Sequence, residues 1–186
     1  GLAALSEIRR RCPAADVCFF ADYENAPYGT KKRSELIQLV SRDILMLRDA
    51  GADKILMACC TASTVYKYLP KEMREVSIPI IDVTAKQAAL ATRCGRVGVI
   101  GTAATVHSGA FKNSLKLHKA VRAVFELATQ NLVFDVEAGI CDGSFTKKQR
   151  EGLFRTLLPL RQKGIDTLIL GCTHFARIER EISGVL

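Results

Sequence analysis

Two cysteines at the ends of similar apolar stretches are the residues best suited to chemistry. Residues 51–61 read GADKILMACCT, and residues 164–174 read GIDTLILGCTH. In both stretches a turn glycine precedes a short apolar run of strand length, a small residue and a cysteine, Cys59 or Cys172. The two glycines and the two cysteines are each 113 residues apart. This internal repeat predicts two halves of a single site.

A cysteine between a strand and a helix lies beside free helix N–H groups, which favour the thiolate and bind carboxylates. Thr61 and Thr173 follow the two cysteines and can donate hydrogen bonds to the same carboxylate. If the two thiols face each other, one removes a proton from a substrate carbon while the other protonates the opposite side. That arrangement indicates acid–base inversion of a stereocentre.

The rest of the chain alternates strand and helix patterns, which predicts an α/β fold. We expect two pseudo-symmetric domains, residues 1–84 and 85–186, each a mostly parallel sheet flanked by helices. Ligands of such sheets bind beyond the carboxyl ends of the strands, so the active site should lie between the domains.

The local patterns predict the individual elements. Thr146 and Gln149 form a capping-box pattern, and Gly51 and Gly164 stand where helices should end. The expected strands are residues 17–21, 54–58, 78–83, 96–102 and 166–171, with one or two more within 121–136. The expected helices are residues 2–8, 36–47, 61–68, 85–92, 108–117 and 146–163, with a short one before the C-terminus.

Composition restricts the function classes. The chain has 186 residues, is 48% hydrophobic, and has no apolar run long enough to span a membrane. Its formal charge of +8 comes from small scattered groups of basic residues, so nucleic-acid binding is not expected. Seven cysteines, an odd number without zinc-finger spacing, favour a reducing cytoplasm and no metal site.

Four motifs carry a family resemblance. Residues 58–63 (ACCTAS) are similar to a family motif Ala-Cys-Asn-Thr-Ala-Ser, and residues 170–175 (LGCTHF) to Leu-Gly-Cys-Thr-His-Tyr. Residues 27–29 match a Pro-Tyr-Gly loop, and residues 101–108 carry a Gly-Thr-x-x-Thr-x-x-Ser pattern. In this order the motifs cover most of the chain. The chain therefore resembles the cofactor-independent aspartate/glutamate racemase family.

The resemblance implies an isomerase that interconverts L- and D-glutamate without a cofactor and supplies D-glutamate for peptidoglycan, and so for cell-wall biogenesis and cell shape. It implies catalytic roles for Cys59, Cys172, His174 and Glu137. The substrate-binding residues that it implies are Pro27, Tyr28, Gly29, Cys60, Thr61, Thr102, Thr105 and Thr173. The expected partner is the amino acid itself, in a protein that can form a homodimer.

Two departures leave alternatives open. Cys60 stands where the family has asparagine, and a thiol is a poorer hydrogen-bond partner. Both termini are expected to be incomplete, because the family's Asp-Ser-Gly-x-Gly-Gly motif would end at about Gly1-Leu2 and the family chain continues past the second cysteine to complete the first domain. The alternatives are a related enzyme acting on aspartate, hydantoins or maleate, with one cysteine as a nucleophile, and an amino-acid-binding protein without catalysis.

Overall fold

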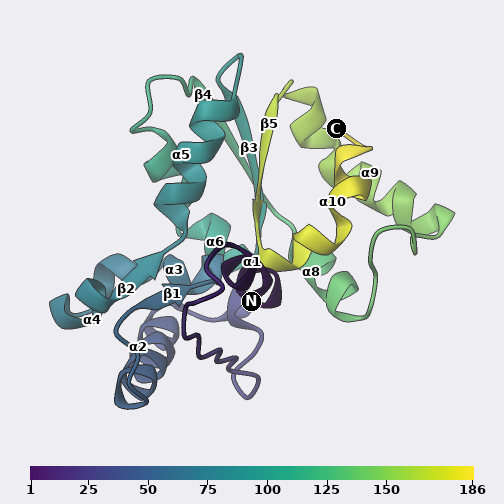
Figure 1. Ribbon diagram of the computed structural model, residues 1–186. Coiled ribbons are helices and arrows are strands. Elements are labelled where there is room, and N and C mark those ends of the chain that lie inside the picture. The colour runs from purple at the N-terminus through teal and green to yellow at the C-terminus, as the bar shows by residue number, and fades with distance from the viewer.

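Two separate parallel sheets organise the computed structural model (Figure 1). It describes the backbone of residues 1–186 and every side chain except that of Ala3. The first sheet pairs β1 (Ile55–Met57) with β2 (Ser77–Pro79), and the second has the order β4 (Ala123–Ala128), β3 (Arg96–Gly101), β5 (Thr167–Gly171). The expected α/β class with parallel sheets and flanking helices is therefore confirmed.

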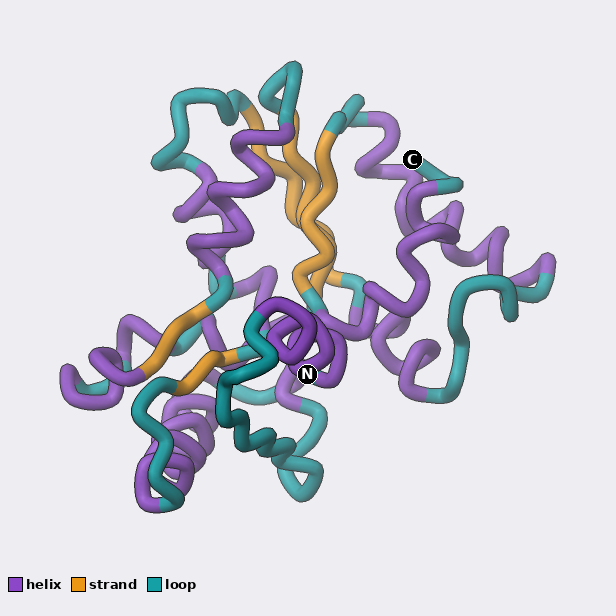
Figure 2. The backbone as a smooth tube through the Cα atoms, viewed as in Figure 1, coloured by secondary structure: helices purple, strands orange, loops and turns teal.

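Helices connect all of these strands (Figure 2). They are α1 (Leu2–Arg11), η1 (Tyr28–Thr30), α2 (Arg33–Asp49), α3 (Cys60–Ser63), η2 (Tyr66–Tyr68), α4 (Lys71–Val76), α5 (Ile81–Ala91), α6 (Ala103–His107), α7 (Ala110–Leu115), α8 (Gln130–Glu137), α9 (Lys147–Gln162), η3 (Thr173–Ile178) and α10 (Glu179–Ser183). Within the described chain, every helix is too short or too polar to cross a membrane.

The second sheet has a packed layer on each face. Figure 1 shows α5 beside one face of β3–β5 and α9 and α10 beside the other. Val97 and Val99 of β3 pack into the cluster that holds α5 and α7, whereas Ile100 packs with α9, η3 and α10. Successive strand residues point to opposite faces, so a strand covered on both sides is apolar throughout. This burial explains the continuous apolar run of β3.

The first sheet is covered by α2. Leu36, Val40 and Ile44 lie one helical turn apart and pack with Ile55 and Met57 of β1. The amphipathic pattern predicted for this helix is confirmed. The predicted boundary between residues 84 and 85 falls inside α5, and the division into two domains stays a prediction.

One repeated device, a glycine with positive φ, ends the helices before the cysteine-bearing strands. Gly51 follows α2 with φ +92°, and Gly164 follows α9 with φ +58°, a conformation in which glycine avoids the Cβ clash. Thr146 and Gln149 form the predicted capping box at the start of α9. The glycine turn is common to both halves of the repeat and precedes a strand in each, whereas the capping box occurs only at α9.

The predicted strand at residues 17–21 is wrong. These residues have no regular secondary structure, and Phe19 and Phe20 are 42% and 38% exposed. A strand needs a neighbour to satisfy its backbone groups, and no strand of the described chain pairs with this segment. An apolar run alone does not specify such a neighbour.

Other element boundaries also differ. Of the strand predicted at residues 78–83, only the first two residues belong to β2. The later ones begin α5, whose buried face includes Ile81, Ala85 and Ala88. The helix predicted at 61–68 divides into α3 and η2, and residues 121–136 contain one strand followed by α8. The helix predicted at 108–117 is α7 alone, preceded by α6 and by Gly109 at φ +63°. Short apolar runs fit a strand and a buried helix equally well, which explains the first of these errors.

Candidate active site

Cys59 and Cys172 each occupy the position between a strand and the helix that follows. Cys59 is the N-cap of α3, where its Sγ accepts a hydrogen bond from the backbone N–H of Ala62 at 3.5 Å. Cys172 comes directly after β5 and begins η3, and it is buried. The repeat therefore places both thiols at carboxyl ends of parallel strands, as the sequence predicted.

Cys172 is the first member of a chain of three groups. Its Sγ lies 3.3 Å from Nδ1 of His174, and Nε2 of His174 lies 3.4 Å from Oε1 of Glu137. An ionised carboxylate only accepts hydrogen bonds, so it favours the imidazole tautomer with the proton on Nε2. The lone pair of Nδ1 then faces the thiol of Cys172. His174 can thus exchange a proton with the sulfur.

Burial raises the pKa of Cys172 to about 11. This pKa already includes the backbone N–H of His174, which lowers it, and negative charge at Cys59 and at Glu137, which contributes to the rise. The charge at Cys59 therefore acts on Cys172. Because like charges repel, this arrangement disfavours a state in which both sulfurs are thiolates.

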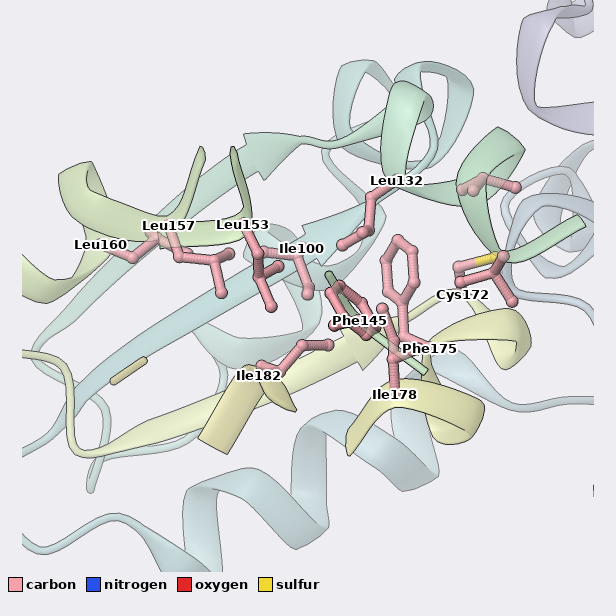
Figure 3. Packing of buried hydrophobic residues seen from close by; sticks show 12 residues of the cluster. Ile100, Leu132, Phe145, Leu153, Leu157, Leu160, Cys172, Phe175, Ile178 and Ile182 are labelled. Atoms are coloured by element: carbon pink, nitrogen blue, oxygen red, sulfur yellow. The ribbon is translucent and has the colours of Figure 1, made fainter. Parts of the chain in front are cut away.

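Figure 3 shows Cys172 at one end of the apolar cluster that contains Leu132 and Phe175. Phe175, which is fully buried, also donates its backbone N–H to the carbonyl oxygen of Cys172 at 3.1 Å. A packed aromatic ring and a backbone hydrogen bond hold the segment that carries the thiol. The sulfur is therefore positioned by the core of the second sheet rather than by a loose loop.

Three threonine hydroxyls form a buried cluster between the two sheets. Thr61 Oγ1 of α3 lies 2.9 Å from Thr102 Oγ1 and 3.0 Å from Thr105 Oγ1. Thr102 also caps α6 by accepting the backbone N–H of Thr105 at 3.1 Å. The cluster joins α3, which follows β1, to α6, which follows β3. The structure thus brings together three of the predicted substrate-binding residues.

The Pro27–Gly29 loop reaches the same cluster. Gly29 is buried, and a Cβ at this position would lie 2.6 Å from Cβ of Thr102 and 2.7 Å from Oε1 of Gln130. Only a glycine allows the loop backbone to approach so closely. Tyr28 turns its hydroxyl towards Asp22 and Asp43, at 2.7 and 2.8 Å.

The remaining predicted residues differ in exposure. Cys60 is 5% exposed and packs in the apolar cluster of α5, α7 and β3. Burial raises the pKa of its thiol, and charge at Cys59 and Cys172 adds to the shift. Cys60 is therefore a neutral thiol at neutral pH. Thr173, the other residue of this set, is half-buried beside Cys172.

A cavity of about 620 Å³ lies beside this site but does not include the thiols. It shares Gly29 with the site, and its wall includes Arg33, Lys67 and Tyr68. The site is therefore defined by side-chain contacts around the two cysteines and not by this cavity.

Three neighbours of the site were not predicted from the sequence. Gln130, whose Oε1 accepts from the backbone N–H of Ala103 at 3.4 Å, shows no recognisable pattern in the sequence. Asp22 stands at the start of the loop that contains Tyr28, and this position alone indicates its role only weakly. Asp43 does not differ in the sequence from the other polar residues of α2. Only tertiary contacts identify the last two as partners of Tyr28.

Comparison with known proteins assigns the chain to one group. Residues 8–186 match the family model described as Asp/Glu/Hydantoin racemase. The chain is 37% identical to a glutamate racemase of Desulforudis audaxviator, covering 100% of this chain and 67% of that protein. It is 35% identical to a glutamate racemase of Aquifex aeolicus, with 100% and 71% covered.

Solved structures agree with this assignment. A glutamate racemase of Bacillus anthracis superposes with a TM-score of 0.89 at 30% identity, covering 100% of this chain and 69% of that one. A glutamate racemase of Francisella tularensis in complex with D-glutamate gives a TM-score of 0.89 at 26% identity, with 100% and 69% covered. An Escherichia coli glutamate racemase in complex with L-glutamate and an activator gives 0.76 at 27% identity, with 100% and 70% covered.

Proposed function

The chain belongs to the Asp/Glu/hydantoin racemase family of isomerases, and on this basis we propose that it interconverts L- and D-glutamate. Relatives that match the whole chain are named glutamate racemases. One structural neighbour is in complex with D-glutamate and another with L-glutamate, which supports an α-amino acid with a side-chain carboxylate as the substrate.

We propose that the reaction is a proton transfer between two thiols. The thiolate of one cysteine removes the α-proton, and the electron pair left on Cα is delocalised into the substrate carboxylate. The thiol of the other cysteine donates its proton to the opposite face of Cα. The product is the mirror image, the two sulfurs have exchanged protonation states, and no cofactor is needed.

The observation that carries this mechanism is the contact of Cys172 with His174 and of His174 with Glu137. A thiol with a pKa of about 11 is protonated at neutral pH, so it is prepared to act as an acid. To act as a base in the reverse direction it must lose that proton, and Nδ1 of His174 is placed to accept it. Glu137 stabilises the imidazolium that results.

The buried hydroxyl cluster supports a role in substrate binding. Thr61, Thr102 and Thr105 lie between the strand ends, beside the loop of Gly29. Together with the half-buried Thr173, they can donate hydrogen bonds to a carboxylate. We assign this region to the substrate, with Pro27, Tyr28 and Cys60 shaping its walls.

The product suggests the cellular role. D-glutamate is a component of peptidoglycan, so we place the reaction in the supply of cell-wall precursors. All seven cysteines are free thiols, as a two-thiol reaction requires, and a reducing cytoplasm would keep them so. A homodimer stays a prediction from the family resemblance.

The test is hydrogen exchange at the α-carbon of glutamate in deuterated water, followed by NMR from each pure enantiomer. Cys59→Ser and Cys172→Ser should each slow exchange by about 10²-fold or more, the scale of a lost acid or base. Each variant should affect one enantiomer more than the other, because each thiol serves one face. Cys18→Ser, which changes an exposed thiol, is the control and should retain activity. Wild-type rates in both site variants would refute the two-thiol mechanism.

Cys60 is the observation that favours a second candidate, a relative acting on another substrate. Its buried thiol offers a weaker hydrogen bond than an amide would. Exchange assays on aspartate and hydantoins, and an assay for conversion of maleate to fumarate, run beside glutamate, separate these substrates. A covalent cysteine adduct in the mass spectrum would indicate nucleophilic catalysis, and glutamate binding without exchange would indicate a binding protein.

A further inference from the structure

A compact polar cluster surrounds the hydroxyl of Tyr28 in the Pro27–Gly29 loop. The hydroxyl of Tyr28 lies 2.7 Å from Oδ2 of Asp22 and 2.8 Å from Oδ2 of Asp43. Nη2 of Arg42 donates to the same two carboxylates, at 2.7 Å to Asp22 and 2.8 Å to Asp43. The side chains of Asp22 and Asp43 are only 8% and 16% exposed. Four groups from the loop and from α2 thus share one set of short contacts.

The charges explain why the cluster holds together. Two carboxylates so close would repel each other, but the guanidinium of Arg42 binds both of them. Asp22 accepts further hydrogen bonds at Oδ1 from Asn25, at 2.9 Å from its side chain. Burial acts against ionisation of Asp22, yet the hydrogen bonds from Asn25 and Tyr28 and the charge of Arg42 lower its pKa. The cluster is therefore a well-satisfied anchor and not a strained one.

The anchor is attached directly to the site. Tyr28 and Gly29 are adjacent residues of η1, and Gly29 presses against Thr102 and Gln130. Tyr28 is therefore held by α2 of the first sheet, while Gly29 lies against the second. The position of the Gly29 backbone beside Thr102 depends on both attachments, because η1 is only three residues long.

We propose that Asp43, together with Asp22 and Arg42, is a positioning residue that holds the Gly29 backbone in place for substrate binding, acting through the hydroxyl of Tyr28. This role rests on the proposed function, in which Gly29 lines the glutamate site. The carboxylate of Asp43 does not touch the substrate. It restricts the loop, so that the loop pays less ordering entropy when glutamate binds.

Steady-state kinetics test the positioning role. Tyr28→Phe and Asp43→Ala should each raise KM for glutamate about tenfold, the scale of one charge-assisted hydrogen bond, and should leave kcat within about threefold. The double variant should be no worse than the poorer single variant, because both changes break the same contact. Asp43→Asn should retain most of the affinity, since its carbonyl oxygen still accepts from the phenol. Tyr23→Phe, in the same loop but 81% exposed, and Asp49→Asn, exposed on the same helix, are matched controls and should not change KM.

A second measurement works without activity. Backbone hydrogen exchange of residues 27–31, followed by mass spectrometry, should be faster in Asp43→Ala than in wild type and unchanged in Asp49→Asn. Unchanged exchange in Asp43→Ala overturns the positioning role, whatever the enzyme does. So does a fall in kcat at constant KM, or fully additive effects in the double variant. If the wild-type chain does not act on glutamate but the loop exchange responds as expected, only the proposed function fails.

Discussion

Adding one methyl group at Gly29 is the most direct test of how the loop meets the second sheet. In Gly29→Ala the new Cβ would lie 2.6 Å from Cβ and Cγ2 of Thr102 and 2.7 Å from Oε1 of Gln130. The backbone of Gly29 is not in the left-handed region, so an alanine is conformationally allowed there. Any destabilisation must therefore come from the clash alone.

The magnitude follows from what must move. Overpacking a fitted contact costs about 1–3 kcal/mol, and a displaced Thr102 would lose its 2.9 Å contact with Thr61, a further ~1 kcal/mol. We expect a loss of roughly 2–4 kcal/mol in the free energy of unfolding. With a urea m-value of about 2 kcal/mol/M, the unfolding midpoint should fall by about 1–2 M.

Gly152→Ala is the matched control for this experiment. Gly152 is exposed inside α9, and a Cβ there meets nothing within 4 Å. The same substitution should therefore stabilise the protein, by about 0.5–1 kcal/mol, because alanine is the better helix former. Urea unfolding followed by circular dichroism measures both variants. If Gly29→Ala proved as stable as wild type, the close approach of the loop to Thr102 would be refuted.

Three further outcomes follow from burial and charge. Leu157→Ala leaves a cavity at a fully buried site and should lower the free energy of unfolding by about 2–5 kcal/mol, measured by thermal or urea unfolding. Leu90→Ala, at a residue that is 72% exposed, is the control and should change it by about 0.5 kcal/mol or less. The raised pKa of Cys172 means that the folded state binds the thiol proton more tightly than the unfolded state. The contribution of this thiol to the free energy of unfolding should therefore be fully present below about pH 9 and should fall as pH rises towards 11. The difference between urea midpoints at pH 8 and at pH 10.5 should be smaller in Cys172→Ser than in wild type. Glu137→Gln removes the charge that stabilises protonated His174, so α-proton exchange should slow more for the enantiomer that Cys172 deprotonates; equal slowing of both enantiomers would contradict this role.

Several features could be predicted because they depend on neighbours in sequence. The glycine after α2 and the glycine after α9 each end a helix by local backbone geometry, and the capping box at Thr146 involves residues three apart. The 113-residue repeat placed Cys59 and Cys172 at strand ends for the same reason. Local sequence was also enough to identify α2, whose apolar face recurs at every turn.

Other features depend on partners that the local pattern does not reveal. The apolar run at residues 17–21 fits a strand, but an extended segment becomes one only where a neighbouring strand receives its hydrogen bonds. The run at residues 78–83 changes from strand to helix because Ile81 finds a core shared with β3. Tyr28 could be expected in a substrate loop, yet its hydroxyl points to Asp22 and to Asp43, and Asp43 lies fifteen positions along the chain.

The sequence by itself determined the kinds of chemical groups and their placement at strand ends: two thiols, each followed closely by threonine, with histidine near the second. Only the tertiary structure decided how those groups act on one another. It brought Glu137 to His174, joined Thr61 to Thr102 and Thr105, and buried Cys172 enough to raise its pKa. Hydrogen bonding and desolvation depend on distances of a few ångströms between segments far apart in the chain, and packing sets those distances.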